Sequence, residues 1–196
     1  MANIPEWWEE WVISDVADVL NWYAFKSSDL WSDKEGTLPV FKMWNINKWG
    51  GLKWTWKEDY YVWDPNNIDQ KFFSKPFDIL MCMTDMKANM NLLWYSARIK
   101  NEKFLINQRV WIVRPKKDKI DPVYLSYFMN CKLYIDLLRT TAHSGVQVNL
   151  STDWIKNSPV RFPDINKQKA IAKLLSTIDD KIELNNQINH NLSYVT

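Results

Sequence analysis

Hydrophobic residues before Asp121 occur in short runs separated by turn-forming residues, which is typical of strands. The nearly continuous apolar run at 78–83 predicts a buried strand. Residues 44–77 are polar and turn-rich, and their pattern assigns no element. The remaining runs predict a turn of helix followed by a strand within 11–20, a strand at 37–43, and a hairpin at 96–115.

From Asp121 onward the apolar residues take the spacing of helices. Asp121 followed by Pro122 is a typical helix start, because Asp accepts hydrogen bonds from free backbone N–H groups and Pro suits the first helical position. We expect this helix to end near Ala142 and a loop to follow at 146–163.

A last helix is expected to run from Asp164 toward the C-terminus. Its apolar residues at 171, 175, 178 and 182 are spaced four, three and four apart, the a/d rhythm of a coiled coil. Some 28 residues of helix would extend roughly 40 Å, which is longer than a small domain needs to cover its core. The alternatives are packing on its own domain and pairing with a partner helix, and the length favours the partner. The predicted interface comprises Ile171, Leu175, Ile178, Ile182, Asn185, Ile188 and Leu192.

The pattern as a whole predicts an α+β fold. A domain of mixed strands and helices is expected at 1–163, followed by a long coiled-coil helix at 164–196. The hydrophobic fraction of 46% suffices for a core, and a net charge of +2 does not by itself demand nucleic acid. The two cysteines, Cys82 and Cys131, lie in apolar runs, and we expect free thiols in a cytoplasmic protein. No apolar run approaches the roughly 18 residues of a membrane span, so no membrane partner is expected.

The chain has 13 tryptophans but only 4 glycines in 196 residues, whereas the average glycine content is about 7%. Many of these tryptophans have turn-forming neighbours and follow neither a strand nor a helix period. Trp cannot replace Gly where the backbone needs a positive φ. The tryptophans in such glycine-like contexts are Trp7, Trp22, Trp31, Trp44, Trp49, Trp56, Trp63, Trp94 and Trp111.

Residues that could carry out chemistry are sparse. The sequence has no Gly-rich cofactor loop, no phosphate-binding loop and no His/Cys metal spacing, and its only histidines are His143 and His190. We therefore expect a binding protein without catalytic residues, cofactor or metal.

Several short motifs occur in a particular order along nearly the whole chain. They are Ile4-Pro5-Glu6-x-Trp8, Asn21 to Ser27, Lys42 to Ile46, Asp78-Ile79-Leu80-Met81, Asn107-Gln108-Arg109-Val110, Tyr124-Leu125, Ser144-Gly145-x-Gln147, and Pro163 with Gln168, Ile171, Ala172, Leu175, Asp179 and Ile182. The ordered set resembles one half of the specificity subunit of type I restriction–modification systems. Such a half is a DNA target-recognition domain followed by a long helix.

The resemblance implies a subunit that reads one half of a bipartite target in double-stranded DNA and performs no chemistry. Its implied partners are methyltransferase (modification) subunits, the restriction subunit, and a second recognition half that pairs through the last helix. Two alternatives stay open: a recognition domain cut from a single-chain restriction–methylation enzyme, and a coiled-coil adaptor that does not bind DNA.

DNA binding needs cations for phosphates and amide or guanidinium groups for base edges. Candidates in the turn-rich parts are Tyr23, Lys26, Ser27, Lys42, Asn45, Lys48, Lys53, Lys87, Asn89, Arg98, Gln108 and Arg109. Asn107 and Gln108 are equally compatible with a structural role. The basic cluster of Arg114, Lys116, Lys117 and Lys119 either touches the DNA backbone or is simply a charged loop.

The resemblance to the specificity subunit also places glycine where this chain has tryptophan in a glycine-like context. It does so most firmly at positions 7, 22, 44, 94 and 111. We call the nine residues in such contexts the glycine-context tryptophans. The other four rest mainly on their turn contexts, whereas Trp8, Trp11, Trp54 and Trp154 fit as tryptophan. Glycine at all nine would raise the glycine content to about 7%, the average. The sequence thus suggests that a stop-type codon, read as glycine by the source organism, stands here as tryptophan. The alternative is a chain that is genuinely rich in tryptophan.

Overall fold

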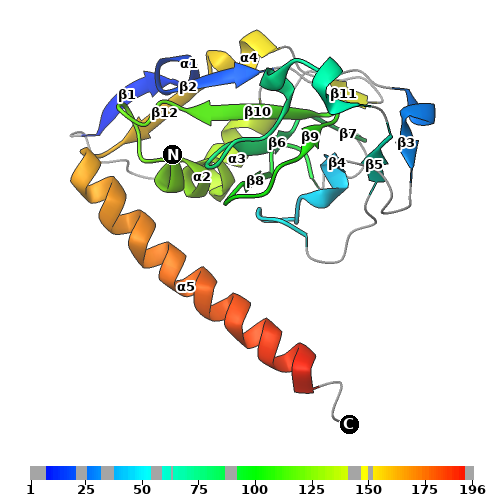
Figure 1. The fold of residues 1–196 in the computed structure, drawn as a ribbon. Coiled ribbons are helices and arrows are strands. Elements are labelled where there is room, and N and C mark those ends of the chain that lie inside the picture. Colours follow the sequence, from blue (N-terminus) through cyan, green and yellow to red (C-terminus); the bar gives the residue numbers. More distant parts are fainter. Residues whose placement is uncertain are drawn as a thin grey trace.

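The computed structural model of the chain describes residues 8–20, 26–31, 38–53, 59–62, 64–86, 92–140, 147–149 and 152–192. These residues form an α+β domain from which one long helix projects, as Figure 1 shows. The predicted fold class is confirmed.

The core of the domain is a four-stranded antiparallel sheet. Its strands are ordered β2 (Ala17–Leu20), β10 (Val110–Pro115), β6 (Ile79–Cys82) and β8 (Ser96–Arg98). All four residues of β6 are buried, which confirms the buried strand predicted at 78–83. A central strand that is covered on both faces reads as a continuous apolar run, and this is why its signal is local and strong.

The hairpin predicted at 96–115 is wrong. β8 pairs with β6, and β10 lies between β6 and β2, so the two expected arms are not neighbours. The chain between them forms β9 (Leu105–Ile106), which pairs in parallel with β4 (Leu38–Phe41). Short apolar runs predict strands but do not specify which partner each strand takes.

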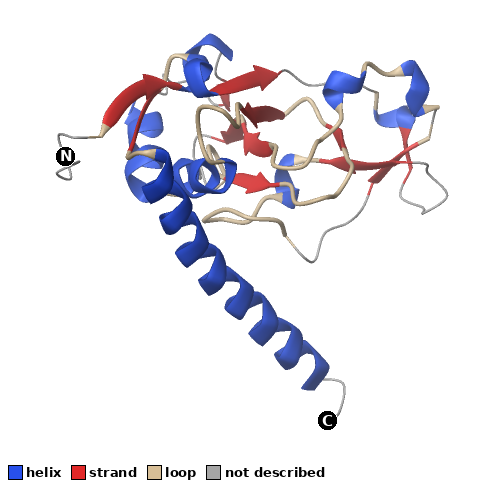
Figure 2. Cartoon of the chain, turned by 60° about the vertical axis from the view of Figure 1, so that its left-hand side comes forward, coloured by secondary structure: helices blue, strands red, loops and turns tan. Residues whose placement is uncertain are grey.

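A second sheet, ordered β3 (Leu30–Trp31), β5 (Asp59–Tyr61), β4 and β9, forms its own lobe. It has a small separate core that includes Val40, Tyr61 and Phe73. In Figures 1 and 2 this lobe lies at the end of the domain away from the start of the long helix. β4 confirms the strand predicted at 37–43. Four single 3-10 turns are Ser27–Asp29, Met43–Asn45, Pro65–Asn67 and Gln70–Phe72.

The N-terminal part follows the prediction for 11–20. A single turn of helix, α1 (Ile13–Val16), leads directly into β2. Before it, β1 (Glu9–Val12) pairs antiparallel with β12 (Pro159–Phe162), which joins the two ends of the domain.

The loop predicted at 146–163 is also wrong, because the segment contains β11 (Gln147–Asn149), α4 (Thr152–Lys156) and β12. β11 pairs with β7 (Thr84–Met86), more than sixty residues earlier in the chain. These short elements exist through distant partners, and their own pattern carries little signal.

The helix predicted from Asp121 begins as expected. Its carboxylate accepts hydrogen bonds from the N–H groups of Val123 (3.0 Å) and Tyr124 (2.8 Å). The helix does not continue to Ala142, however. It is split into α2 (Pro122–Asn130) and α3 (Lys132–Thr140), because Cys131 between them has an extended backbone with ψ 145°.

The last helix, α5 (Ile165–Leu192), is confirmed and is 28 residues long. Both figures show it leaving the domain and extending away from it. Within the described part of the chain, no helix combines the length and the apolar character needed to cross a membrane.

Candidate nucleic-acid interface

Two turns with exposed polar residues meet at one edge of the domain. β4 and β9 are parallel, and the C-terminal ends of parallel strands lie at the same edge, so the turns that follow them are adjacent. The N–H of Asn107, after β9, donates to the carbonyl of Phe41 at the end of β4 (3.0 Å). The N–H of Met83, after β6, donates to the carbonyl of Arg109 (3.2 Å). We call residues 42–53 and 107–109 the turn edge.

The turn edge carries exposed cations. Lys48, Lys53 and Arg109 are exposed, and none of them forms a salt bridge within the described residues. Gln108 is exposed beside Arg109. Lys42 differs, because its Nζ is bonded to the carboxylate of Asp59 and its side chain is mostly buried. Cations without acidic partners keep their full attraction for phosphate, so these three side chains are suited to a polyanion.

Asn45 holds the first turn together rather than facing solvent. It is 1% exposed, and its Oδ1 accepts a hydrogen bond from the N–H of Lys42 (2.7 Å). Its carbonyl accepts one from the N–H of Lys53 (3.0 Å). The sequence correctly marked this turn, but a polar residue type alone does not distinguish a side chain that contacts a ligand from one that caps backbone groups.

Asn107 plays the same part in the second turn. Its Oδ1 accepts from the N–H of Arg109 (3.3 Å), and its carbonyl accepts from the N–H of Val110 (3.0 Å). Asn107 therefore shapes the turn, while the side chains of Gln108 and Arg109 are presented to solvent.

Arg98 lies at the other end of the central sheet. It pairs in register with Ile79, the first residue of β6. The carbonyl of Arg109, in contrast, accepts from the N–H of Met83, which follows the last residue of β6. About 13 Å of strand separates these two ends. The charge of Arg98 acts on Tyr127 of α2: burial raises the pKa of Tyr127 to about 12, and Arg98 opposes that rise.

The remaining predicted contacts are only partly described. Lys26 is exposed, and its N–H donates to Oδ2 of Asp29 (2.7 Å). Lys26 directly precedes the 3-10 turn at Ser27–Asp29, which leads into β3 of the second sheet. Tyr23, Lys87 and Asn89 lie outside the described residues.

Two of the four cations in the basic cluster at 114–119 are bound within the fold. Arg114 forms a two-point contact with the buried carboxylate of Asp78 (2.8 Å from both Nε and Nη2) and also donates to the carbonyl of Phe73. Lys116 donates to the carbonyl of Ser14 (2.7 Å). Only Lys117 and Lys119 of the cluster are exposed.

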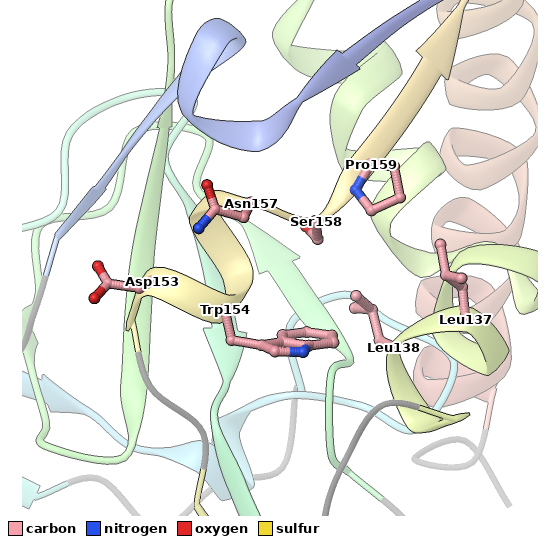
Figure 3. Close-up of a pocket in the computed structure, with 7 residues that line it drawn as sticks. All are labelled: Leu137, Leu138, Asp153, Trp154, Asn157, Ser158 and Pro159. Carbon is pink, nitrogen blue, oxygen red and sulfur yellow. The ribbon is translucent and has the colours of Figure 1, made fainter.

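A hollow of about 400 Å³ lies between α3 and the α4–β12 segment, as Figure 3 shows. It is lined by Leu137, Leu138, Asp153, Trp154, Asn157, Ser158 and Pro159. Asp153 is its single carboxylate and lies 4.0 Å from Lys156. One exposed, salt-bridged carboxylate beside apolar side chains does not provide an acid and a base for catalysis. Among the described residues, no group of three His, Cys, Asp or Glu side chains could hold a metal.

The predicted seam of α5 is divided between two environments. Ile171 and Leu175 are half-buried, and Ile171 packs against the core of its own domain. The seam residues beyond them are exposed: Ile178, Ile182, Asn185, Ile188 and Leu192.

A family model described as the type I restriction modification DNA specificity domain matches residues 5–194. This range includes the turn edge, both four-stranded sheets and α5. The chain belongs to this family.

Known members of the family resemble the chain over most of its length. It is 24% identical over 179 residues to the type I restriction enzyme EcoBI specificity subunit of Escherichia coli, covering 91% of this chain and 34% of that protein. It is 23% identical over 191 residues to the MjaVIII specificity subunit of Methanocaldococcus jannaschii, covering 94% of this chain and 42% of that protein. The chain thus spans between a third and a half of the length of these specificity subunits.

Two solved structures share the fold. The HsdS subunit from Thermoanaerobacter tengcongensis matches with a TM-score of 0.62 and 15% identity, over 93% of this chain and 40% of that one. The S subunit of a type I restriction-modification system from M. genitalium matches with a TM-score of 0.63 and 18% identity, over 93% and 41%.

Proposed function

We propose that this specificity domain reads one half of a bipartite target in double-stranded DNA through the turn edge, and that α5 joins it to a second recognition half. The assembled pair would hold the methyltransferase and restriction subunits on the target. The observation that carries the proposal is the family match over residues 5–194.

The geometry of the turn edge supports the DNA-binding part. Lys48, Lys53 and Arg109 project from turns whose backbones are fixed by Asn45 and Asn107. Rigid turns that present cations can contact phosphates at low entropic cost, and the exposed Gln108 and Arg109 have the donors that read base edges.

The exposed side chains of α5 support the pairing part. Ile178, Ile182, Ile188 and Leu192 expose between 46% and 59% of their surface. Packing such a row of apolar side chains against another helix removes it from water, which stabilises the pair.

The salt dependence of DNA binding tests the first part. Each phosphate contact adds about 0.9 to the slope of log affinity against log salt, so Lys48→Ala and Arg109→Ala should each weaken binding and reduce the slope by about 1. Lys181→Ala, a change to an exposed cation of α5, is the matched control and should leave the slope unchanged. Equal slopes for all four proteins would remove the turn edge from the interface.

A further inference from the structure

Two of the glycine-context tryptophans have a backbone conformation that suits glycine. Trp49 has φ 78° and Trp94 has φ 76°. Among the described residues, Phe77 is the only other non-glycine with a positive φ. In this left-handed region the Cβ atom approaches the following carbonyl oxygen, so bulky residues are strained there and glycine is not.

The contacts of the turn impose the conformation of Trp49. Trp49 is followed by Gly50 (φ 97°) and Gly51 (φ 87°), which makes three successive left-handed residues. The N–H of Gly51 donates to the carbonyl of Ser96 (2.9 Å), and the N–H of Asn47 donates to the carbonyl of Gly51 (2.9 Å). The Trp49 side chain is 67% exposed, so its burial offsets little of the strain.

Trp94 is strained and also leaves a polar atom unsatisfied. Its backbone is fixed at the end of β6, because its N–H donates to the carbonyl of Cys82 (3.1 Å). Its side chain is fully buried, yet its Nε1 has no hydrogen-bond partner. Trp111, whose ring centroid is 6.2 Å away, has the same defect. Buried indole N–H groups normally have a hydrogen-bond partner, so two adjacent tryptophans without one are unusual in a protein core.

We infer that the cell that encodes this chain inserts glycine at positions 49 and 94, by decoding as glycine a stop-type codon that stands here as tryptophan. The backbone angles support this independently of the family resemblance. The inference extends by sequence context to Trp31, Trp44 and Trp111, and to Trp7, Trp22, Trp56 and Trp63, which lie outside the described residues.

Peptide mass spectrometry of the protein from its source cell tests the inference directly. We expect glycine at 49 and 94, and tryptophan at 11 and 154. The gene should correspondingly use one codon at 49 and 94 and a different one at 11 and 154. Tryptophan at either 49 or 94 in the cellular protein would overturn the inference.

Thermal unfolding tests the conformational argument separately. Trp49→Gly should raise Tm by about 2–4 °C, the shift that relief of a modest strain gives in a domain of this size. Trp44→Gly is the matched control: Trp44 is also exposed (47%), but its φ is not positive, so its replacement should not raise Tm. Equal Tm changes for the two variants would contradict the argument. Trp94→Gly should raise Tm less than Trp49→Gly, because the cavity left by the buried ring opposes the relief of strain.

A second observation concerns the direction of α5. Two sets of polar contacts join this helix to the domain. Near its start, the buried Gln168 accepts from the N–H of Asp121 (2.9 Å) and donates to the carbonyl of Pro163 (2.8 Å). Farther along, the hydroxyl of Tyr127 on α2 donates to Asp179 (2.6 Å).

Gln168 lies beside Ile171 and Ala172, which pack in the core, so this part of α5 is the pivot, and a second contact farther along fixes the direction of the helix. Gln168 and Asp179 are about 16 Å apart along the helix axis. A weaker salt bridge between Lys100 and Glu183 (3.5 Å) follows the second contact. Beyond Glu183, every residue up to 192 whose side chain is described is exposed.

We propose that Tyr127 is a positioning residue that sets the angle between α5 and the turn edge, and through it the spacing of the two half-sites. This rests on the proposed function. Loss of the Tyr127–Asp179 bond would leave the turn edge intact but let the part of α5 beyond the packed Ile171 and Ala172 change its direction. The selected spacer length should therefore become less strict while half-site binding stays the same.

The test compares duplexes that carry an isolated half-site with duplexes whose two half-sites are separated by different spacers, using the complex with its modification subunits. Tyr127→Phe and Asp179→Asn should bind the half-site as the parent does, and lose less affinity than the parent when the spacer changes by one base pair. Asp180→Asn, one residue along α5, is the control and should keep the parental preference. An unchanged preference in both variants would overturn the positioning role. No binding by the parent would overturn the proposed function itself.

Discussion

Single polar side chains fix the backbone at the turns of this domain. Asn45 and Asn107 accept hydrogen bonds from the turns that they belong to, and Asp121 accepts two at the start of α2. Asn130 joins α2 to β8 by bonds to both the N–H and the carbonyl of Ser96 (2.9 and 3.1 Å). Such bonds give an acceptor to backbone N–H groups that the turns leave without one, so their removal should lower stability.

The cap at Asp121 gives a direct prediction. Asp121→Ala should lower the free energy of unfolding by about 1 kcal/mol, because two N–H groups of the first turn lose their acceptor. Asp121→Asn keeps an acceptor oxygen and should cost only a small part of this. Urea unfolding of the three proteins measures the difference, and equal losses for Ala and Asn would contradict a capping role.

Tyr127 predicts a dependence on pH. Burial, assisted by the hydrogen bond to Asp179, raises the pKa of Tyr127 to about 12 from its ordinary 10. The folded state therefore favours the neutral phenol, so this contribution to stability is complete below pH 10 and is lost as the pH rises from 10 toward 12. The stability advantage of the parent over Tyr127→Phe should shrink across that range. An advantage that stays constant from pH 9 to about 12 would show that the pKa is not raised.

At the scale of elements, local sequence signals predicted single helices and strands. They did not predict which distant strands pair with one another. The buried run of β6, the Asp121–Pro122 start of α2 and the spacing of α5 are properties of contiguous residues, and each predicted its element. The pairing of β1 with β12 joins segments about 150 residues apart in the chain, and no local pattern encodes it. The break at Cys131 has no proline or glycine to announce it.

The same distinction applies to the candidate site. Turn-rich composition selected Lys48, Gln108 and Arg109, which are exposed in the structure, and their contact with DNA stays a prediction. It also selected Asn45, which is buried, and Arg98, which pairs with the first residue of β6, at the other end of the central sheet. A residue type indicates what a side chain can do, whereas only the packing decides whether it faces solvent.

The exposed seam of α5 predicts self-association of the chain. Ile178→Asp and Ile182→Asp place charges on the predicted interface and should shift the protein toward a monomer, since burying an unpaired charge is costly. Leu184→Asp is the matched control: Leu184 is equally exposed (55%) but lies off the seam, so its change should preserve association. Sedimentation equilibrium measures the outcome, and a monomeric parent protein would contradict the predicted seam.

At the scale of the whole molecule, a domain with a cationic turn edge is joined to a helix that extends away from it (Figure 1). The first half of α5 is attached to the domain, and its second half presents apolar residues to solvent. This arrangement separates the surface proposed to bind DNA from the surface proposed to bind the second half. Variants at the seam should therefore leave half-site affinity unchanged, and variants at Lys48 or Arg109 should leave association unchanged.

Selection from a random pool of duplex DNA tests the central proposal most directly. The protein, with glycine at the nine positions and in the presence of its modification subunits, should enrich one defined sequence, and Arg109→Ala should reduce that enrichment while Lys181→Ala should not. Recovery of the pool without any enriched sequence would contradict the proposal that this chain reads DNA.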